Sequence, residues 1–240
     1  MHLAVTTEGD GPVRVALVHG VVGSSLGWHD LVAAAEAAEP GRCTFLLPDL
    51  RGHGASARAD RYRMTDFASD LVETLPTGLD CVVGHSLGGR VLADAVAALQ
   101  PERAVYLDPG FTVGLPTTGP AAALFWHLPG LGPVLNRLYR QTDRRWGADN
   151  RARARAGHRR FDSAALLPVL RDAAEHPVVP APPAVPSTVV LTDDGFRVVP
   201  DALLAALTDA GWDVRRLPGV RHDLHLQAPE RTYELIRDLL

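Results

Sequence analysis

The chain has 240 residues, of which 46% are hydrophobic and 22% are charged, a composition that supports a large buried core and excludes intrinsic disorder as its main character. Its formal net charge of -4 and its pI near 6.2 give no reason to expect a nucleic-acid partner, since such partners favour basic proteins. We therefore expect chemistry on a small molecule.

Membrane insertion and export are not indicated. The first nine residues lack the basic start and the apolar stretch of a signal peptide, so we expect a cytoplasmic protein. The longest apolar candidate, residues 121–135, is interrupted by two prolines and two glycines and is too short for a transmembrane helix. Cys43 and Cys81 open separate apolar runs with no CxxC neighbour, so we expect two buried thiols rather than a disulfide or a metal pair.

Short apolar runs alternate with amphipathic stretches along most of the chain. Runs typical of buried strands lie at residues 13–18, 43–47, 81–83, 104–107, 188–191 and 212–217. Stretches typical of helices lie at residues 26–38, 64–75, 87–99, 201–209 and 230–240. This alternation predicts an α/β fold whose sheet is mostly parallel and carries helices on both faces.

The alternation stops between residues 111 and 185. A loop of this length without structure is uncommon, so we predict a mostly helical insertion over residues 111–185, within a core of residues 1–110 and 186–240. The insertion ends in a proline-rich stretch at residues 177–186, which favours an extended return to the sheet. We expect this insertion to lie as a cap over one edge of the sheet.

Residues 84–88 read Gly-His-Ser-Leu-Gly and lie between a predicted strand and a predicted helix. The pattern G-x-S-x-G places a serine on a sharp strand-to-helix turn, where only small residues fit two positions before and after it. Gly84 and Gly88 fill those two positions. Ser86 is therefore a candidate nucleophile, and the alternative is an ordinary turn serine.

A serine hydroxyl becomes a nucleophile only beside a base, which in turn needs a carboxylate to orient it. His222 follows the last predicted strand and precedes the last predicted helix, which makes it the candidate base. A tetrahedral oxyanion also needs backbone donors, one from the residue after the serine and one from an early loop. The N–H groups of Leu87 and Val21 occupy these two places.

Four stretches, taken together and in this order, resemble the α/β-hydrolase superfamily, in its capped lipase, esterase and haloperoxidase-like branch. The resemblance covers nearly the whole chain outside the predicted cap. The four stretches are residues 17–20 (Leu-Val-His-Gly), 47–56 (Leu-Pro-Asp-Leu-Arg-Gly-His-Gly-Ala-Ser), 83–89 (Val-Gly-His-Ser-Leu-Gly-Gly) and 221–226 (Arg-His-Asp-Leu-His-Leu).

The resemblance implies that Ser86 is the nucleophile and that His222 acts first as general base and then as general acid. It also implies an oxyanion hole made by the N–H groups of Val21 and Leu87, and no cofactor. His225 follows His222 by three residues, but no third ligand accompanies the pair, so we expect no metal site.

The acid of the triad fits the family pattern least well. Relatives commonly carry Gly-x-x-Asp after the strand that corresponds to residues 188–191, whereas here a threonine and a glycine fill those two places. We expect Asp194 to be the acid. The loop that carries it would then be one residue shorter than in those relatives, and residues 196–200 would absorb the difference. Asp193 is an alternative, and so is Asp108, because some relatives carry the acid after the preceding strand.

The resemblance implies hydrolysis of an ester, thioester or lactone through an acyl-enzyme on Ser86. C–C bond hydrolases and cofactor-free haloperoxidases use the same triad and stay open. From a different class, the alternative is a catalytically silent member that serves as a ligand receptor or a scaffold. Trp28 and Trp126 are candidates for the wall of the substrate pocket, with simple packing as the alternative. The sequence does not indicate an oligomeric state.

Overall fold

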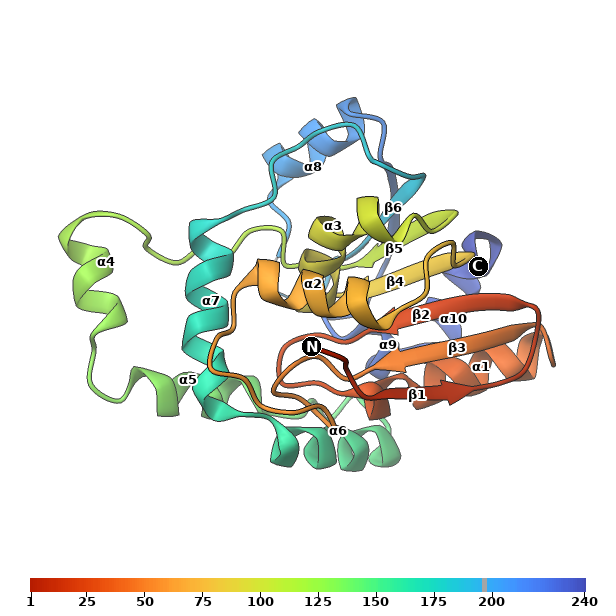
Figure 1. Ribbon diagram of the computed structural model, residues 1–240, viewed down its shortest axis with the longest axis horizontal. Coiled ribbons are helices and arrows are strands. Elements are labelled where there is room, and N and C mark those ends of the chain that lie inside the picture. The colour runs from red at the N-terminus through yellow and green to blue at the C-terminus, as the bar shows by residue number, and fades with distance from the viewer. Residues whose placement is uncertain (196–197) are drawn as a thin grey trace.

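The structure is a computed structural model that describes residues 1–195 and 198–240. Its centre is a seven-stranded sheet in the order β1-β3-β2-β4-β5-β6-β7 (Figure 1). All neighbouring strands are parallel except the β1–β3 pair, so the predicted α/β fold is confirmed. The strands are β1 (Val5–Glu8), β2 (Val13–Val18), β3 (Cys43–Pro48), β4 (Cys81–His85), β5 (Arg103–Leu107), β6 (Ser187–Thr192) and β7 (Asp213–Leu217).

The register of the central strands brings three loops to one edge of the sheet. Gly84 in β4 pairs with Val18 in β2 on one side and with Tyr106 in β5 on the other. Each of these strands ends within a residue or two of that level. The segments that follow β2, β4 and β5 therefore leave the sheet side by side.

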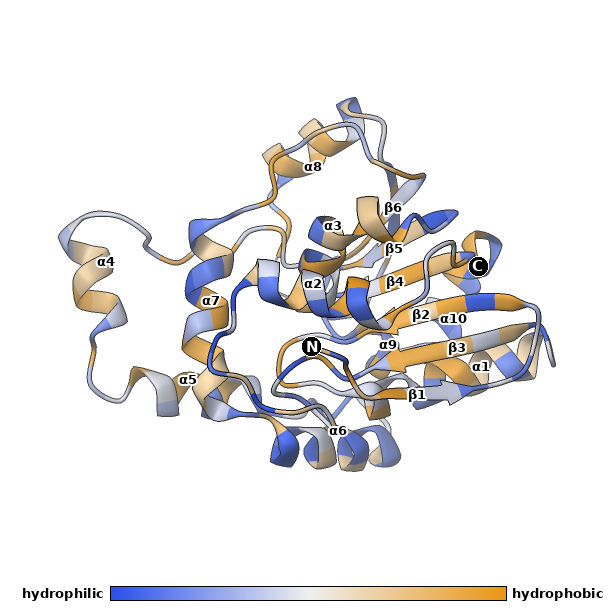
Figure 2. Cartoon of the chain, viewed as in Figure 1, coloured by the Kyte–Doolittle hydropathy of each residue, from blue (hydrophilic) through white to orange (hydrophobic). Residues whose placement is uncertain are grey.

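Helices cover both faces of the sheet, and two apolar clusters fill the space between the layers. One cluster includes residues of α2, α3 and α8, and the other includes residues of α1 and α10. Figure 2 shows the apolar strands between these layers. The helices are α1 (His29–Ala38), α2 (Met64–Thr74), α3 (Leu87–Leu99), α8 (Asp201–Asp209), α9 (Leu224–Gln227) and α10 (Pro229–Ile236).

The stretch between β5 and β6 contains helices and no strand. The face of α7 that carries Leu166, Val169 and Leu170 packs into the core cluster of α2 and α3, whereas α6 is polar along most of its length (Figure 2). The division of the chain into a core and a cap stays a prediction. The helices of this stretch are α4 (Gly119–Trp126), α5 (Leu131–Tyr139), α6 (Ala148–Arg160) and α7 (Leu166–Glu175).

Both cysteines lie on central strands. Cys43 in β3 and Cys81 in β4 are free and buried, and this burial raises the pKa of each thiol. In residues 1–195 and 198–240, no helix combines the length and the apolarity that crossing a bilayer requires.

Candidate active site

Ser86 occupies the turn between β4 and α3 in a strained conformation, with φ of 50° and ψ of -114°. A β-carbon added to Gly84 would lie 2.7 Å from the carbonyl oxygen of Gly88, and one added to Gly88 would lie 2.2 Å from that of Val18. Both positions therefore require glycine, because the helix backbone crosses directly against the strands. The close crossing holds the serine at the end of the strand.

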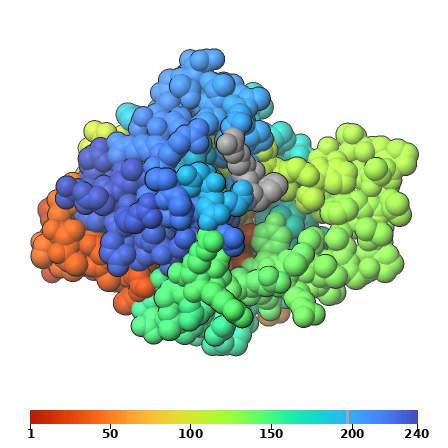
Figure 3. All heavy atoms as spheres, turned by 180° about the vertical axis from the view of Figure 1, so that it is seen from behind, coloured from red at the N-terminus to blue at the C-terminus, as the bar shows by residue number. Residues whose placement is uncertain are grey.

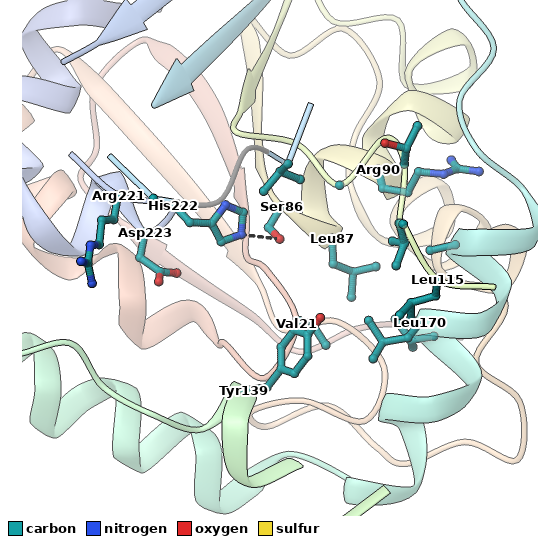
Figure 4. Close-up of a pocket in the computed structure, with 18 of the residues that line it drawn as sticks. Val21, Ser86, Leu87, Arg90, Leu115, Tyr139, Leu170, Arg221, His222 and Asp223 are labelled. Atoms are coloured by element: carbon teal, nitrogen blue, oxygen red, sulfur yellow. Dashed lines mark hydrogen bonds between the residues drawn. The ribbon is translucent and has the colours of Figure 1, made fainter. Parts of the chain in front are cut away.

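The side chains of Ser86, His222 and Asp108 form one chain of hydrogen bonds. The His222 Nδ1–H donates to Asp108 Oδ2 at 2.6 Å, because a carboxylate only accepts. This tautomer leaves Nε2 free to accept the Ser86 hydroxyl, with 2.9 Å between Nε2 and Oγ (Figure 4). The arrangement can move a proton from the serine to the histidine and stabilise the imidazolium that forms.

Asp108 directly follows β5, the strand beside β4, so its place in the sheet brings it to the Ser86 turn. Its φ is 40°, and its N–H donates to the carbonyl of Val190 at 2.7 Å. The carboxylate is 3% exposed and also accepts the hydroxyl of Thr192 at 3.3 Å. The carboxylate is thus fixed from two sides.

The structure differs from the expectation that Asp194 contacts the histidine. Asp194 is ion-paired with Arg145, which belongs to the α5–α6 loop, and it lies 3.8 Å from Arg221 Nε. The side chain of Asp194 is 37% exposed, and two guanidinium groups hold it away from the His222 ring. The position beside the ring is filled by Asp108, which the sequence offered only as an alternative.

Asp193 is also turned away from the histidine. Its carboxylate accepts the N–H of Gly219 at 2.6 Å and so ties the loop after β6 to the loop before His222. Residues 196 and 197, part of the stretch expected to absorb a shorter acid loop, lie outside the described residues.

The charges around the ring favour its protonated form. Burial lowers the pKa of His222, but the hydrogen bond to Asp108 and the negative charges of Asp223 and Asp108 outweigh it, so the pKa is raised above its ordinary value. Burial in turn raises the pKa of the Asp223 carboxyl, partly offset by His222. The histidine is therefore a better proton acceptor than a free imidazole.

The N–H groups of Val21 and Leu87 lie on two segments that meet at Ser86. Leu87 is the first residue of α3, so its N–H is one of the unpaired donors at a helix N-terminus. A β-carbon on Gly20 would lie 3.1 Å from the Ser86 β-carbon, which shows how closely the other segment approaches. Within the described residues neither N–H donates to a backbone acceptor, and the oxyanion hole at this place stays a prediction.

His19 fixes the shape of the loop that carries Val21. Its Nε2 accepts the N–H of Leu50 at 3.0 Å, and its Nδ1–H donates to the carbonyl of Gly20 at 2.8 Å. Burial lowers the pKa of His19, so the ring stays neutral and can accept and donate at once. The sequence signals for His19 were its position at the end of the first long apolar run and its place in the Leu-Val-His-Gly stretch of residues 17–20.

Two cavities meet at Ser86 and His222. The larger has a volume of about 610 Å³ and the smaller about 250 Å³. Figure 4 shows Leu87, Leu115 and Leu170 on one side of Ser86 and Asp223 on the other. Residues that line both cavities are Val21, Ser86, Tyr139, Trp146, His222 and Asp223.

Neither Trp28 nor Trp126 lines these cavities, contrary to expectation. Trp28 is fully buried on the side of the sheet that α1 covers, with its ring 4.2 Å from that of His225. Trp126 ends α4 and donates its Nε1–H to the carbonyl of Pro116 at 2.8 Å. Packing decides which way each indole points, and Trp146 is the tryptophan that faces the site.

Side chains suited to hold a metal ion do not gather in the described residues, where no group of three or more His, Cys, Asp or Glu is suitably placed. His225 contacts the rings of Trp28 and His85, so it is a packed histidine at the back of the site.

Two curated proteins resemble part of the sequence. The 2-(acetamidomethylene)succinate hydrolase of Mesorhizobium japonicum is 34% identical over 99 residues, which cover 40% of this chain and 34% of that protein. Lipase LipV of Mycobacterium tuberculosis is 37% identical over 105 residues, which cover 41% of this chain and 38% of that protein. The matches thus span little more than a third of each relative's length.

The fold is also found in solved structures. A crystal structure of E-2-(acetamidomethylene)succinate hydrolase matches with a TM-score of 0.72 at 24% identity, covering 99% of this chain and 94% of that one. Residues 15–235 match the family described as the alpha/beta hydrolase family. This match extends over most of the chain and includes the Ser86 turn, Asp108 and His222, and the chain belongs to the alpha/beta hydrolase family.

Proposed function

We propose that this chain is a serine hydrolase that cleaves an ester, thioester or lactone through an acyl-enzyme on Ser86. The observation that carries the proposal is the hydrogen-bonded chain from Ser86 Oγ to His222 Nε2 and from His222 Nδ1 to Asp108, at 2.9 Å and 2.6 Å. Asp108 replaces Asp194 as the proposed acid.

In the first half of the reaction Ser86 Oγ attacks the carbonyl carbon of the substrate while its proton passes to His222 Nε2. The tetrahedral oxyanion accepts hydrogen bonds from the N–H groups of Val21 and Leu87, which the fold holds in place before the reaction. The bond to the leaving oxygen or sulfur then breaks, and His222 gives that atom its proton.

In the second half a water molecule attacks the acyl-enzyme and gives a proton to His222. A second oxyanion forms in the same place and collapses, the acid departs, and the proton returns to Ser86. Asp108 stays ionised throughout and stabilises the imidazolium in both halves.

The helical stretch between β5 and β6 is proposed to act as the cap. It supplies Tyr139 and Trp146 to both cavities and Leu170 to the larger one. The cap therefore helps to select the substrate, while the loops at the sheet edge carry the chemistry. A ligand receptor is disfavoured because its function would not require Ser86, His222 and Asp108 to be hydrogen-bonded in sequence.

Labelling with a fluorophosphonate and turnover of p-nitrophenyl butyrate test the proposal. Wild-type protein should be labelled and active, whereas Ser86→Ala should lose the label and lower kcat by about 10³-fold or more. The control is Ser69→Ala, on the exposed face of α2, which should behave as wild type. A folded wild-type chain that neither labels nor turns over any ester would favour the receptor instead.

A further inference from the structure

The two cavities at Ser86 differ in chemistry as well as in volume. An ester has two parts on either side of its carbonyl group, the acyl chain and the leaving group, and each needs a space of its own. The volumes and linings of the two cavities therefore indicate which part of the substrate is large and which is small. This inference rests on the proposed acyl transfer.

Most of the surface that lines the larger cavity is apolar, and its aliphatic side chains include Leu115, Leu135, Val169 and Leu170. Charged side chains also line it, namely Arg90, Asp143, Asp194, Arg221 and Asp223. Two of the aliphatic side chains come from the face of α7 that is packed on the core, so the wall is backed by a rigid element. With about 610 Å³, the cavity is within the range of sites that enclose a drug-sized ligand. It suits an extended apolar group.

One buried cation, Arg90, also lines the larger cavity. Its Nη1 lies 2.7 Å from Asp94 Oδ1 and its Nη2–H donates to the carbonyl of His176 at 2.9 Å, while Nε and Nη1 form no hydrogen bond within the described residues. The Asp94 carboxylate offsets the guanidinium charge in part, so an anionic acyl chain is the competing substrate that the test has to include.

Polar side chains make up a larger share of the lining of the smaller cavity than of the larger one, among them Ser24, Gln141, His158 and His225. Burial lowers the pKa of His158 to about 4 and that of His225 to about 3, so both rings are neutral donors and acceptors near pH 7. With about 250 Å³, the space holds only a small group, and it also suits water molecules, each of which occupies about 30 Å³ in the liquid.

The second half of the reaction decides which part goes where. The water that attacks the acyl-enzyme takes the place that the leaving group has vacated, so that place has to be polar. The acyl chain stays bound during this step and is best held in the apolar cavity. We propose that the chain acts on esters of an extended apolar acid with a small polar alcohol, the acyl chain lying in the larger cavity and the alcohol in the smaller one.

A pair of isomeric esters tests this orientation. Ethyl octanoate and octyl acetate contain the same atoms and differ only in which side of the ester group carries the long chain. The release of acid is measured by titration at constant pH. We expect kcat/KM for ethyl octanoate to exceed that for octyl acetate by at least tenfold. Equal values, or a preference for octyl acetate, would overturn the proposal.

Narrowing the larger cavity should change the choice of acyl chain. Leu170→Trp should lower the ratio of kcat/KM for p-nitrophenyl octanoate to that for p-nitrophenyl acetate by at least tenfold. Leu115→Trp, in the less buried part of the wall, serves if the first variant does not fold. The matched control is Leu124→Trp, because Leu124 is 67% exposed on α4 and should keep the wild-type ratio.

The possible failures can be told apart. If Ser86 is labelled by a fluorophosphonate but both wall variants keep the wild-type ratio, the orientation is wrong and the acyl-enzyme proposal stands. If monomethyl suberate is preferred to methyl octanoate, Arg90 rather than the aliphatic wall selects the acyl chain, which overturns the proposed apolar acid although the acyl chain still lies in the larger cavity. If folded wild-type protein is not labelled, the proposed function itself fails.

Discussion

Val22, Ser86 and Asp108 all have a positive φ, which residues other than glycine seldom adopt, with values of 57°, 50° and 40°. Each costs about 1–3 kcal/mol and persists only where the surrounding structure imposes it. The three residues follow three adjacent strands and meet at the candidate site. At the scale of single residues, the site is therefore a place where packing overrides local backbone preference.

Two single substitutions test whether Asp108 or Asp194 is the carboxylate that acts with His222. Asp108→Asn replaces the carboxylate that accepts the His222 Nδ1–H with a neutral amide that can donate to Nδ1, and should lower kcat by about 10⁴-fold, as loss of the correct tautomer does in other triads. Asp194→Asn removes an ion pair with Arg145 and should lower kcat by far less. Steady-state hydrolysis of p-nitrophenyl butyrate compares the two, and a larger loss for Asp194→Asn would contradict the geometry.

The raised pKa of His222 predicts the acidic limb of the pH profile. Protonated His222 cannot accept the serine proton, so kcat/KM should rise with pH and reach half its maximum above the ordinary histidine value of about 6.5. Asp223→Asn removes a negative charge that favours the protonated ring and should move this midpoint to lower pH. Asp209→Asn, on the exposed side of α8, is the control. A midpoint that Asp223→Asn leaves in place would contradict the electrostatic origin of the shift.

Sequence motifs predicted Ser86 and His222, and the structure brings them together, but they did not single out Asp108. Asp194 and Asp193 follow β6 in a loop whose path depends on a distant guanidinium, Arg145, and no local pattern reveals such a partner. The available signal for Asp108 was its position directly after β5, the neighbour of the strand that carries the serine. The prediction that Trp28 lines the substrate pocket was wrong for a related reason, because the direction of its side chain depends on which face of the sheet its segment covers.

At the scale of elements, the crossing of α3 against β2 and β4 fixes the site. Gly88→Ala would place a β-carbon 2.2 Å from the Val18 carbonyl oxygen, and a strand backbone cannot move aside easily. We expect a loss of about 3 kcal/mol or more in the free energy of unfolding, at the upper end of overpacking.

Denaturant unfolding followed by circular dichroism measures this loss. The matched variant is Gly147→Ala at the start of α6, where an added β-carbon meets no heavy atom within 4 Å and should change the stability by less than about 1 kcal/mol. Equal stabilities of the two variants would show that the helix can retreat from the strand.

The alternation of apolar runs and amphipathic stretches predicted β2 to β7 and the helices on both faces, because buried parallel strands leave a continuous apolar pattern. β1 left no such pattern: it reads Val-Thr-Thr-Glu and is mostly exposed at the sheet edge, paired only with β3. An edge strand forms by backbone pairing with its neighbour, so its side chains need not show an apolar pattern.

At the scale of the whole molecule, four charged side chains join the helical stretch to the sheet loops. Arg145 pairs with Asp194, and Arg221 lies 3.2 Å from Asp143 and 3.8 Å from Asp194. Figure 3 shows, from behind, the green helical stretch against the blue C-terminal part of the chain. Three of these four partly exposed residues, Asp143, Asp194 and Arg221, line the larger cavity.

Exposed ion pairs contribute about 0.2–1 kcal/mol each and weaken with salt. Amide hydrogen exchange in residues 131–147 should therefore quicken about 1.5- to 5-fold in Arg145→Gln, and in wild type at high salt, while exchange in the central strands stays unchanged. Arg159→Gln, on the exposed face of α6, is the control. Exchange that responds to neither the variant nor salt would mean that apolar packing alone holds the stretch.

The burial of both native thiols makes this chain convenient for site-specific spectroscopy. Cys43 is 4% exposed and Cys81 is inaccessible, and thiols with raised pKa values react slowly with maleimides. A single cysteine introduced at the exposed Leu124 can thus carry a fluorophore without prior removal of the native ones. Such a probe would report the motion of α4 relative to the sheet during turnover.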